Sequence, residues 1–144
     1  IAEVEVDPQT GLSTLVSYSA MDDSGNILDH TIVAGQVHGS VAMGVGQAMM
    51  EQTVYDDGGQ LVSASFMDYA MPRAHHFPMF KDEAHIVPAT TNPLGVKGAG
   101  EAGTTAAISA VMNAFADAIP GSGHKIQMPA TPEKVWKACR EMAG

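Results

Sequence analysis

Apolar and polar residues alternate over the first twenty positions of the chain. Ile1–Val6 places apolar side chains between acidic ones, as a half-exposed strand does, and Leu12–Ala20 repeats the alternation. The intervening residues Asp7–Gly11 have the sequence DPQTG, in which proline presets φ and glycine accepts a positive φ. The pattern predicts a β-hairpin over Ile1–Ala20.

From Gln36 to about Thr53 the apolar spacing changes to three and four residues, which is typical of a helix. Three glycines lie inside this helix, and each costs about 1 kcal/mol relative to alanine. They indicate close packing against a neighbouring backbone or a bulky ligand. A second helix is predicted over Thr104–Ile119, and a third begins with Thr131 as N-cap and Pro132 as its first residue.

Shorter patterns complete the predicted element order. Tyr55–Gln60 is a hairpin-type turn, Leu61–Tyr69 has the pattern of a strand, and Glu83–Val87 of a short strand. The order β-β-α-β-β-α-α favours an α+β fold, with a mostly antiparallel sheet on which the glycine-rich helix and the C-terminal helices pack. Residues 1–144 are expected to form a single domain.

Composition narrows the classes of partner. A net charge of −9 argues against binding to nucleic acid or an anionic membrane, and no apolar run is long enough for a transmembrane helix. The single cysteine excludes an internal disulfide and favours a reducing compartment, so we expect a cytoplasmic protein. The ten methionines favour core filling over a binding surface. The chain starts within a strand pattern, without an initiator methionine, so we expect it to be part of a longer protein.

The segment Thr91–Phe115, TNPLGVKGAGEAGTTAAISAVMNAF, contains the pattern G-x-G-x-x-G in Gly98, Gly100 and Gly103. A dinucleotide-binding fingerprint follows a buried strand, whereas the residues before Gly98 include a proline, an asparagine and a further glycine. The Walker pattern is also absent. Nucleotide binding is therefore disfavoured.

Glu101 lies inside this glycine-rich segment, directly before a predicted helix. An acid at that position is stabilised by the helix dipole and by the first N–H groups of the helix. The glycines also leave room for a general base beside a large bound group, and their bare amides would suit an oxygen-rich ligand. The residue pattern alone leaves both interpretations open.

Other sites have weaker signals. Asp22–Asn26 resembles the start of a calcium loop but lacks the glutamate at the twelfth position. No G-x-S-x-G elbow is present, and Cys139 lies on an apolar helix face, which favours a core role over a nucleophile. The histidines lack zinc-ligand spacing; they are His30, His38, His75, His76, His85 and His124.

Four segments, in order along the chain, resemble the large subunit of the molybdenum hydroxylases, the family of carbon monoxide dehydrogenase, xanthine dehydrogenase and aldehyde oxidoreductase. They are VAGQVHGSVAMGVGQAMME (Val33–Glu51), SFMDYAMPRA (Ser65–Ala74), TNPLGVKGAGEAGT (Thr91–Thr104) and MPATPEKVW (Met128–Trp136). The similarity runs from about Ile1 to the end. It implies that the chain is the C-terminal part of the molybdopterin-binding region of a longer subunit.

The resemblance also implies an activity and a site. The glutamate of the K-G-x-G-E motif is the catalytic base at molybdenum in this family, and here it is Glu101. The reaction would be hydroxylation of an electron-poor carbon in an aldehyde or N-heterocycle, or oxidation of carbon monoxide. The residues expected to bind the cofactor are Gly35, Gln36, Lys97, Gly98, Ala99 and Gly100.

The implied cofactor is molybdenum–molybdopterin, in its cytosine dinucleotide form. The implied partners are the upstream part of the large subunit, iron–sulfur and flavin domains or subunits, and a small-molecule substrate. The 144 residues alone are expected to bind no cofactor, to be inactive, and to form a homo-oligomer through an exposed methionine-rich face.

The chain departs from the family pattern at three places. Asp29-His30 stands where Asn-Pro is usual, Gly39-Ser40 where Gly-Gly is frequent, and Met43 where a glutamine is common. Methionine cannot replace the hydrogen bonds of that glutamine. A cofactor-free structural or interaction domain of the same architecture therefore remains the alternative.

Overall fold

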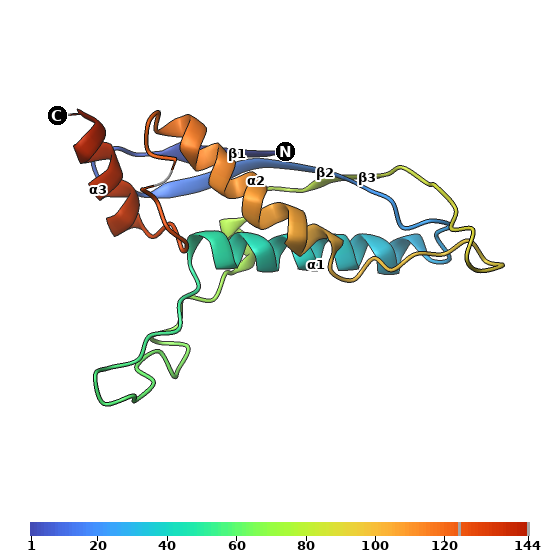
Figure 1. Cartoon of the computed structure of the whole chain (residues 1–144), viewed down its shortest axis with the longest axis horizontal. Coiled ribbons are helices and arrows are strands. Elements are labelled where there is room, and N and C mark those ends of the chain that lie inside the picture. Colours follow the sequence, from blue (N-terminus) through green and yellow to red (C-terminus); the bar gives the residue numbers. More distant parts are fainter. Residues whose placement is uncertain (124, 144) are drawn as a thin grey trace.

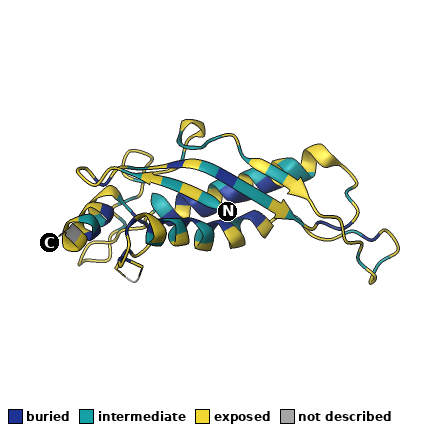
Figure 2. Cartoon of the chain, turned by 90° about the horizontal axis from the view of Figure 1, so that it is seen from above, coloured by how far each residue is buried: buried dark blue, intermediate teal, exposed yellow. Residues whose placement is uncertain are grey.

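The computed structural model describes residues 1–123 and 125–143. It confirms the α+β class: a small sheet has the two long helices on one of its faces and a third helix at one end (Figures 1 and 2). The elements in chain order are β1 (Ala2–Val6), β2 (Ser13–Asp22), α1 (His30–Met49), the 3₁₀ turn η1 (Ala74–His76), β3 (Lys81–Ala84), α2 (Ala102–Ala118) and α3 (Pro132–Ala143).

The predicted hairpin is confirmed, since β1 and β2 pair antiparallel. Its turn forms as the sequence predicts. The Asp7 carboxylate accepts hydrogen bonds from the Gln9 N–H at 2.9 Å and the Thr10 hydroxyl at 2.6 Å, and Gly11 has a φ of 73°. These two bonds lower the pKa of Asp7 below its usual value, Thr10 contributing most.

The sheet is mixed rather than mostly antiparallel. β3 pairs parallel with β2, Ser19 opposite Lys81 and Asp22 opposite Ala84, because α1 and a long segment carry the chain back before β3 begins. The predicted strand Leu61–Tyr69 is wrong: these residues form bends and turns, with a single isolated bridge between Tyr55 and Leu61. A strand needs a paired neighbour, and this segment projects away from the sheet (Figure 1).

Helix α1 begins at His30 rather than Gln36 and ends at Met49 rather than Thr53. Its early start follows from Asp29, whose carboxylate accepts from the N–H groups of Thr31 at 2.9 Å and Ile32 at 3.1 Å. This N-cap satisfies two of the unpaired N–H donors at the start of the helix, and it lies N-terminal to the segment in which apolar residues recur at helical spacing.

Helices α1 and α2 cross at glycine. A Cβ added to Gly44 would lie 2.8 Å from the Ala107 Cβ and 2.9 Å from the Thr104 carbonyl oxygen. One added to Gly103 would lie 2.3 Å from the Ser40 hydroxyl. Part of the predicted reason for the glycines, close approach of another backbone, is therefore confirmed.

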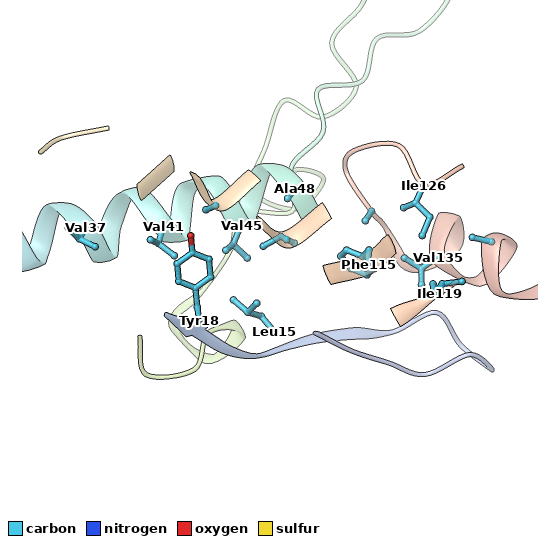
Figure 3. Packing of buried hydrophobic residues seen from close by; sticks show 14 residues of the cluster. Leu15, Tyr18, Val37, Val41, Val45, Ala48, Phe115, Ile119, Ile126 and Val135 are labelled. Carbon is cyan, nitrogen blue, oxygen red and sulfur yellow. The ribbon is translucent and has the colours of Figure 1, made fainter. Parts of the chain in front are cut away.

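The core lies between β2 and the helices. In Figure 3, Leu15 and Tyr18 point from β2 toward Val41 and Val45 of α1. The close α1–α2 crossing leaves room only for small side chains: the buried residues of α1 are valine, alanine, glycine and serine, and the larger Phe115 lies further along α2. The expected role of methionine in the core is wrong for most of them. Seven methionines are exposed: Met21, Met43, Met67, Met71, Met79, Met128 and Met142.

Candidate functional site

A hollow of about 610 Å³ lies between the first half of α1 and the start of α2. On α1 it follows one exposed helical face, because positions 35, 36, 39 and 43 recur at helical spacing. Residues 57 to 70 positions later in the chain form its other wall. The lining residues are Gly35, Gln36, Gly39, Ser40, Met43, Gly100, Glu101, Thr104 and Thr105.

Glu101 is the residue immediately before α2, and its backbone begins that helix. Its carbonyl oxygen accepts from the Thr105 N–H at 3.2 Å and from the Thr105 hydroxyl at 3.1 Å. Within the described part of the chain its carboxylate makes no capping hydrogen bond, and the residue is exposed. The carboxylate is therefore available to the hollow instead of being used as a helix cap.

The start of α2 is fixed to α1 by a hydrogen bond across the crossing. The Thr104 hydroxyl donates to the Ser40 carbonyl oxygen at 2.8 Å, and the Ser40 hydroxyl donates to the Val37 carbonyl oxygen at 3.0 Å. Both acceptors belong to α1, so the residue three positions after Glu101 is attached to the opposite wall of the hollow.

Upstream of Glu101, Lys97 is turned toward the end of β2. Its ammonium group forms an ion pair with the Asp23 carboxylate, and its backbone N–H donates to the Ser24 carbonyl oxygen at 3.0 Å. The bond from Lys97, followed by bonds from the N–H groups of Gly25 and Val87, lowers the pKa of Asp23 to about 2. Asp23 is thus a carboxylate at all ordinary pH values.

The hollow is bordered by glycines whose missing side chains face open space. A Cβ added to Gly35 or Gly39 would have no neighbour within 4 Å, and one added to Gly100 would first meet the Gln36 amide oxygen at 3.7 Å; Gly98, on the loop that leads to the hollow, is equally open. These glycines are not required by packing within this chain. A flat, polar group could approach the backbone here, with the Gln36 amide and the Glu101 carboxylate beside it.

The structure brings Gly35, Gln36, Gly100 and Glu101 together in the hollow. Gly98 and Ala99 precede them on the same loop, whereas the Lys97 side chain lies on the Asp23 flank. Sequence reasoning did not identify Asp23 or Thr105 as part of this region, and no local pattern could have done so. Met43 lies on the hollow and is 62% exposed.

The alternative sites gain no support from the geometry. The residues before Gly98 form a loop, whereas a dinucleotide-binding fingerprint would follow a buried strand.

Metal, nucleophile and membrane-spanning sites also lack support in the described part of the chain. Among residues 1–123 and 125–143, no three His, Cys, Asp or Glu side chains are grouped to hold a metal, and His124 lies outside these residues. Burial, and secondarily Asp7, raises the pKa of the Cys139 thiol, which disfavours a nucleophile. None of the described helices is long and apolar enough to cross a membrane.

Comparison with known proteins identifies relatives that match almost the whole of this chain. Nicotine 6-hydroxylase large subunit from Paenarthrobacter nicotinovorans is 40% identical over 138 residues, which are 95% of this chain and 17% of that protein. Carbon monoxide dehydrogenase large chain from Afipia carboxidovorans is 32% identical over 141 residues, 96% of this chain and 17% of that protein.

Solved structures show the same fold. Reconstituted CO dehydrogenase from Oligotropha carboxidovorans superposes with a TM-score of 0.91 at 32% identity, over 97% of this chain and 18% of that one. Quinoline 2-oxidoreductase from Pseudomonas putida 86 gives a TM-score of 0.87 at 33% identity, over 96% of this chain and 18% of that one. The chain therefore spans less than a fifth of the length of the relatives that it matches.

The resemblance seen in the sequence is confirmed by a family match to residues 1–78, more than half of the chain, described as a molybdopterin cofactor-binding domain. The chain therefore belongs to the family of molybdopterin cofactor-binding domains that are found in the large subunits of molybdenum hydroxylases.

Proposed function

We propose that this chain forms one wall of the cofactor site in the large subunit of a molybdenum hydroxylase, with Glu101 as the catalytic base. The observation that carries the proposal is the hollow in which the Glu101 carboxylate, without a capping bond in the described structure, lies beside glycines that face open space. If Glu101 only capped the helix, its carboxylate would be hydrogen-bonded to the first N–H groups of α2. If the glycines only allowed close packing, a Cβ added to them would meet neighbouring atoms.

The residues of the hollow fit a molybdopterin group by their chemistry. The Gln36 amide can donate and accept hydrogen bonds, and the loop Gly98–Gly100 offers backbone amides with no side chain larger than the Ala99 methyl group beside them. The family resemblance makes the cytosine dinucleotide form our proposal for the cofactor. When bound, it would supply two-electron redox chemistry.

Glu101 would hold the proton that the reaction releases. A carboxylate serves as a base when its pKa is raised toward the working pH by partial burial. In this chain Glu101 is exposed, so its cover would have to come from the cofactor and from the upstream part of the subunit. Thr104 and Thr105 hold the backbone around it and contribute no charge.

The proposed substrate is a small molecule with an electron-poor carbon, an aldehyde or N-heterocycle, or else carbon monoxide. The names of the relatives, nicotine 6-hydroxylase, aldehyde oxidoreductase and carbon monoxide dehydrogenase, support this range. Electrons would leave through iron–sulfur and flavin domains or subunits, because an iron–sulfur cluster needs about four cysteine ligands and this chain has one.

The test is Glu101→Gln in the full-length holoenzyme, assayed with nicotine, benzaldehyde and carbon monoxide. The amide keeps the size of the side chain but cannot take a proton, so kcat should fall by about 100-fold or more while molybdenum per subunit stays unchanged. Asp117→Asn, an exposed acid of α2, is the matched control and should keep full activity.

Two results would change the assignment. Near-normal kcat in Glu101→Gln would refute the role of the base. Absence of molybdenum from the unaltered full-length protein would favour the cofactor-free structural domain, to which Met43 at the rim of the hollow already gives some support.

A further inference from the structure

Asp23 connects three segments that are far apart in the sequence. Its Oδ1 accepts from the Gly25 N–H and the Val87 N–H, each at 3.0 Å, and its Oδ2 pairs with the Lys97 ammonium group. These donors belong to the turn after β2, the segment after β3, and the loop that leads to Glu101. A single carboxylate therefore joins that loop to the end of the sheet.

Backbone contacts continue the attachment along the loop. Gly25 and Val96 form an isolated bridge, and the Asn26 N–H donates to the Gly95 carbonyl oxygen at 2.9 Å. The Asn92 amide binds both the N–H and the carbonyl oxygen of Val96, at 3.1 and 3.0 Å. The loop is thus well fixed up to Lys97.

Between Lys97 and Glu101 the fixation stops. The three intervening residues are Gly98, Ala99 and Gly100, and a Cβ on Gly98 would have no neighbour within 4 Å. Two glycines in three residues give the backbone unusual freedom. Contact with α1 resumes at Gly103, which is buried against Ser40, and at Thr104, whose hydroxyl donates to the Ser40 carbonyl oxygen. Glu101 is therefore held from its two sides, by Lys97 before it and by Thr104 after it.

We propose that the Asp23–Lys97 ion pair is a positioning device that sets where the Glu101 carboxylate stands in the hollow. Lys97 then acts through the loop and not by touching the cofactor. This rests on the proposed role of Glu101 as base. The lysine lines a separate hollow together with Ile27 and Ile32, and its ammonium group is paired with Asp23.

The physical reason is precision. A base must hold its geometry to within about 0.5 Å, and misplacement by about 1 Å can cost two orders of magnitude in rate. A loop with two glycines cannot hold that geometry without fixed ends. Because the Asp23 carboxylate stays ionised down to strongly acidic pH, the pair remains formed across the working range.

The experiment compares Lys97→Met, Asp23→Asn, the double variant and Lys97→Arg in the full-length holoenzyme. Asparagine keeps an oxygen for the bonds from Gly25 and Val87, so Asp23→Asn removes chiefly the charge that faces Lys97. The control is Lys137→Met, which breaks a more exposed ion pair on α3, that with Glu133 at 2.5 Å, far from the loop that carries Glu101.

Three quantities are measured: kcat and KM with whichever of nicotine, benzaldehyde and carbon monoxide the unaltered enzyme oxidises fastest, molybdenum per subunit, and hydrogen exchange of residues 95–101. Each single variant should lower kcat about tenfold or more and change KM less than about threefold. Exchange of the loop should accelerate about tenfold, independently of turnover, and molybdenum should stay unchanged. The double variant should be no worse than either single one, because one interaction is lost. Lys97→Arg should recover most of kcat.

The outcomes that overturn the inference are distinct. Loss of molybdenum in Lys97→Met but not in Asp23→Asn would make Lys97 a cofactor contact. Faster exchange with unchanged kcat would mean that the pair fixes the loop but not the base. If Glu101→Gln is inactive while both pair variants are normal, only this inference fails; an active Glu101→Gln removes the proposed function itself.

Discussion

Gly44→Ala and Gly39→Ala change α1 by the same single methyl group, five residues apart, and should shift its stability in opposite directions. Gly44 is buried at the crossing with α2, whereas Gly39 faces the hollow with no neighbour within 4 Å of an added Cβ. The two substitutions share the same helix and the same gain in helix propensity. Any difference between them therefore reports the crossing.

The magnitude follows from the contacts. At Gly44 the new methyl would meet the Ala107 Cβ at 2.8 Å and the Thr104 carbonyl oxygen at 2.9 Å, and neither atom can rotate away. Overpacking of this kind costs about 3 kcal/mol at the upper end of its usual range. The gain of about 1 kcal/mol from replacing glycine in a helix reduces the net loss to about 2 kcal/mol. At Gly39 only the gain applies, so the free energy of unfolding should rise by about 1 kcal/mol.

The assay is urea unfolding of the chain followed by circular dichroism, with thermal midpoints as a second readout. A difference of about 3 kcal/mol between the two variants corresponds to roughly 10 °C for a chain of this size. The reasoning fails if Gly44→Ala is as stable as the unaltered chain, or if Gly39→Ala is destabilised to the same extent. In the holoenzyme, Gly39→Ala should also lower molybdenum content if the cofactor lies against this face.

Two further predictions concern other parts of the chain. Burial, with smaller contributions from His75 and Arg73, lowers the pKa of His76 below its usual 6.5. Around and below pH 6.5 the folded state therefore binds fewer protons than the unfolded state. The contribution of neutral His76 to the free energy of unfolding is complete above about pH 6.5 and decreases as pH falls through the folded pKa. The protection factor of the Arg73 amide, which donates to the His76 Nδ1 at 3.0 Å, should therefore fall at acidic pH once the intrinsic slowing of amide exchange is corrected for, and a constant protection factor would contradict this. The 144 residues alone should bind no molybdenum and should self-associate through exposed side chains such as Phe66 and Met67; elemental analysis and light scattering test both, and stoichiometric metal or a strictly monomeric species would count against them.

The parts of the fold that the sequence predicted are those that depend on local spacing. The hairpin follows from alternation and the turn at Asp7–Gly11, and α2 from one apolar stripe, so both were found close to their observed limits. The beginning of α1 was missed although its signal, Asp29 as N-cap, was present. Apolar periodicity gave no support there, because the first turns of α1 are largely exposed.

The features that were missed depend on pairing between distant residues. The sequence of Leu61–Tyr69 has the pattern of a strand, but nothing in it specifies a neighbour, and in the described structure it pairs only through the isolated bridge between Tyr55 and Leu61. β3 is parallel to β2 because of the path of the whole intervening chain. For the same reason the Asp23–Lys97 pair, 74 positions apart, could not be read from either segment.

The glycines of the chain have two separate physical explanations, close packing of helices and room for a bound group. The sequence predicts both but does not show which explanation applies to which glycine. At Gly44 and Gly103 the absent side chain allows two helix backbones to approach, which fixes the distance between the walls of the hollow. At Gly35, Gly39 and Gly98 the absent side chain faces open space, which packing within this chain does not require. If only packing had selected glycine, alanine would be favoured at the two open helical positions, Gly35 and Gly39, by about 1 kcal/mol each. Glycine at these two positions is what the proposed cofactor site requires, because the cofactor would lie against this face of α1, opposite Glu101.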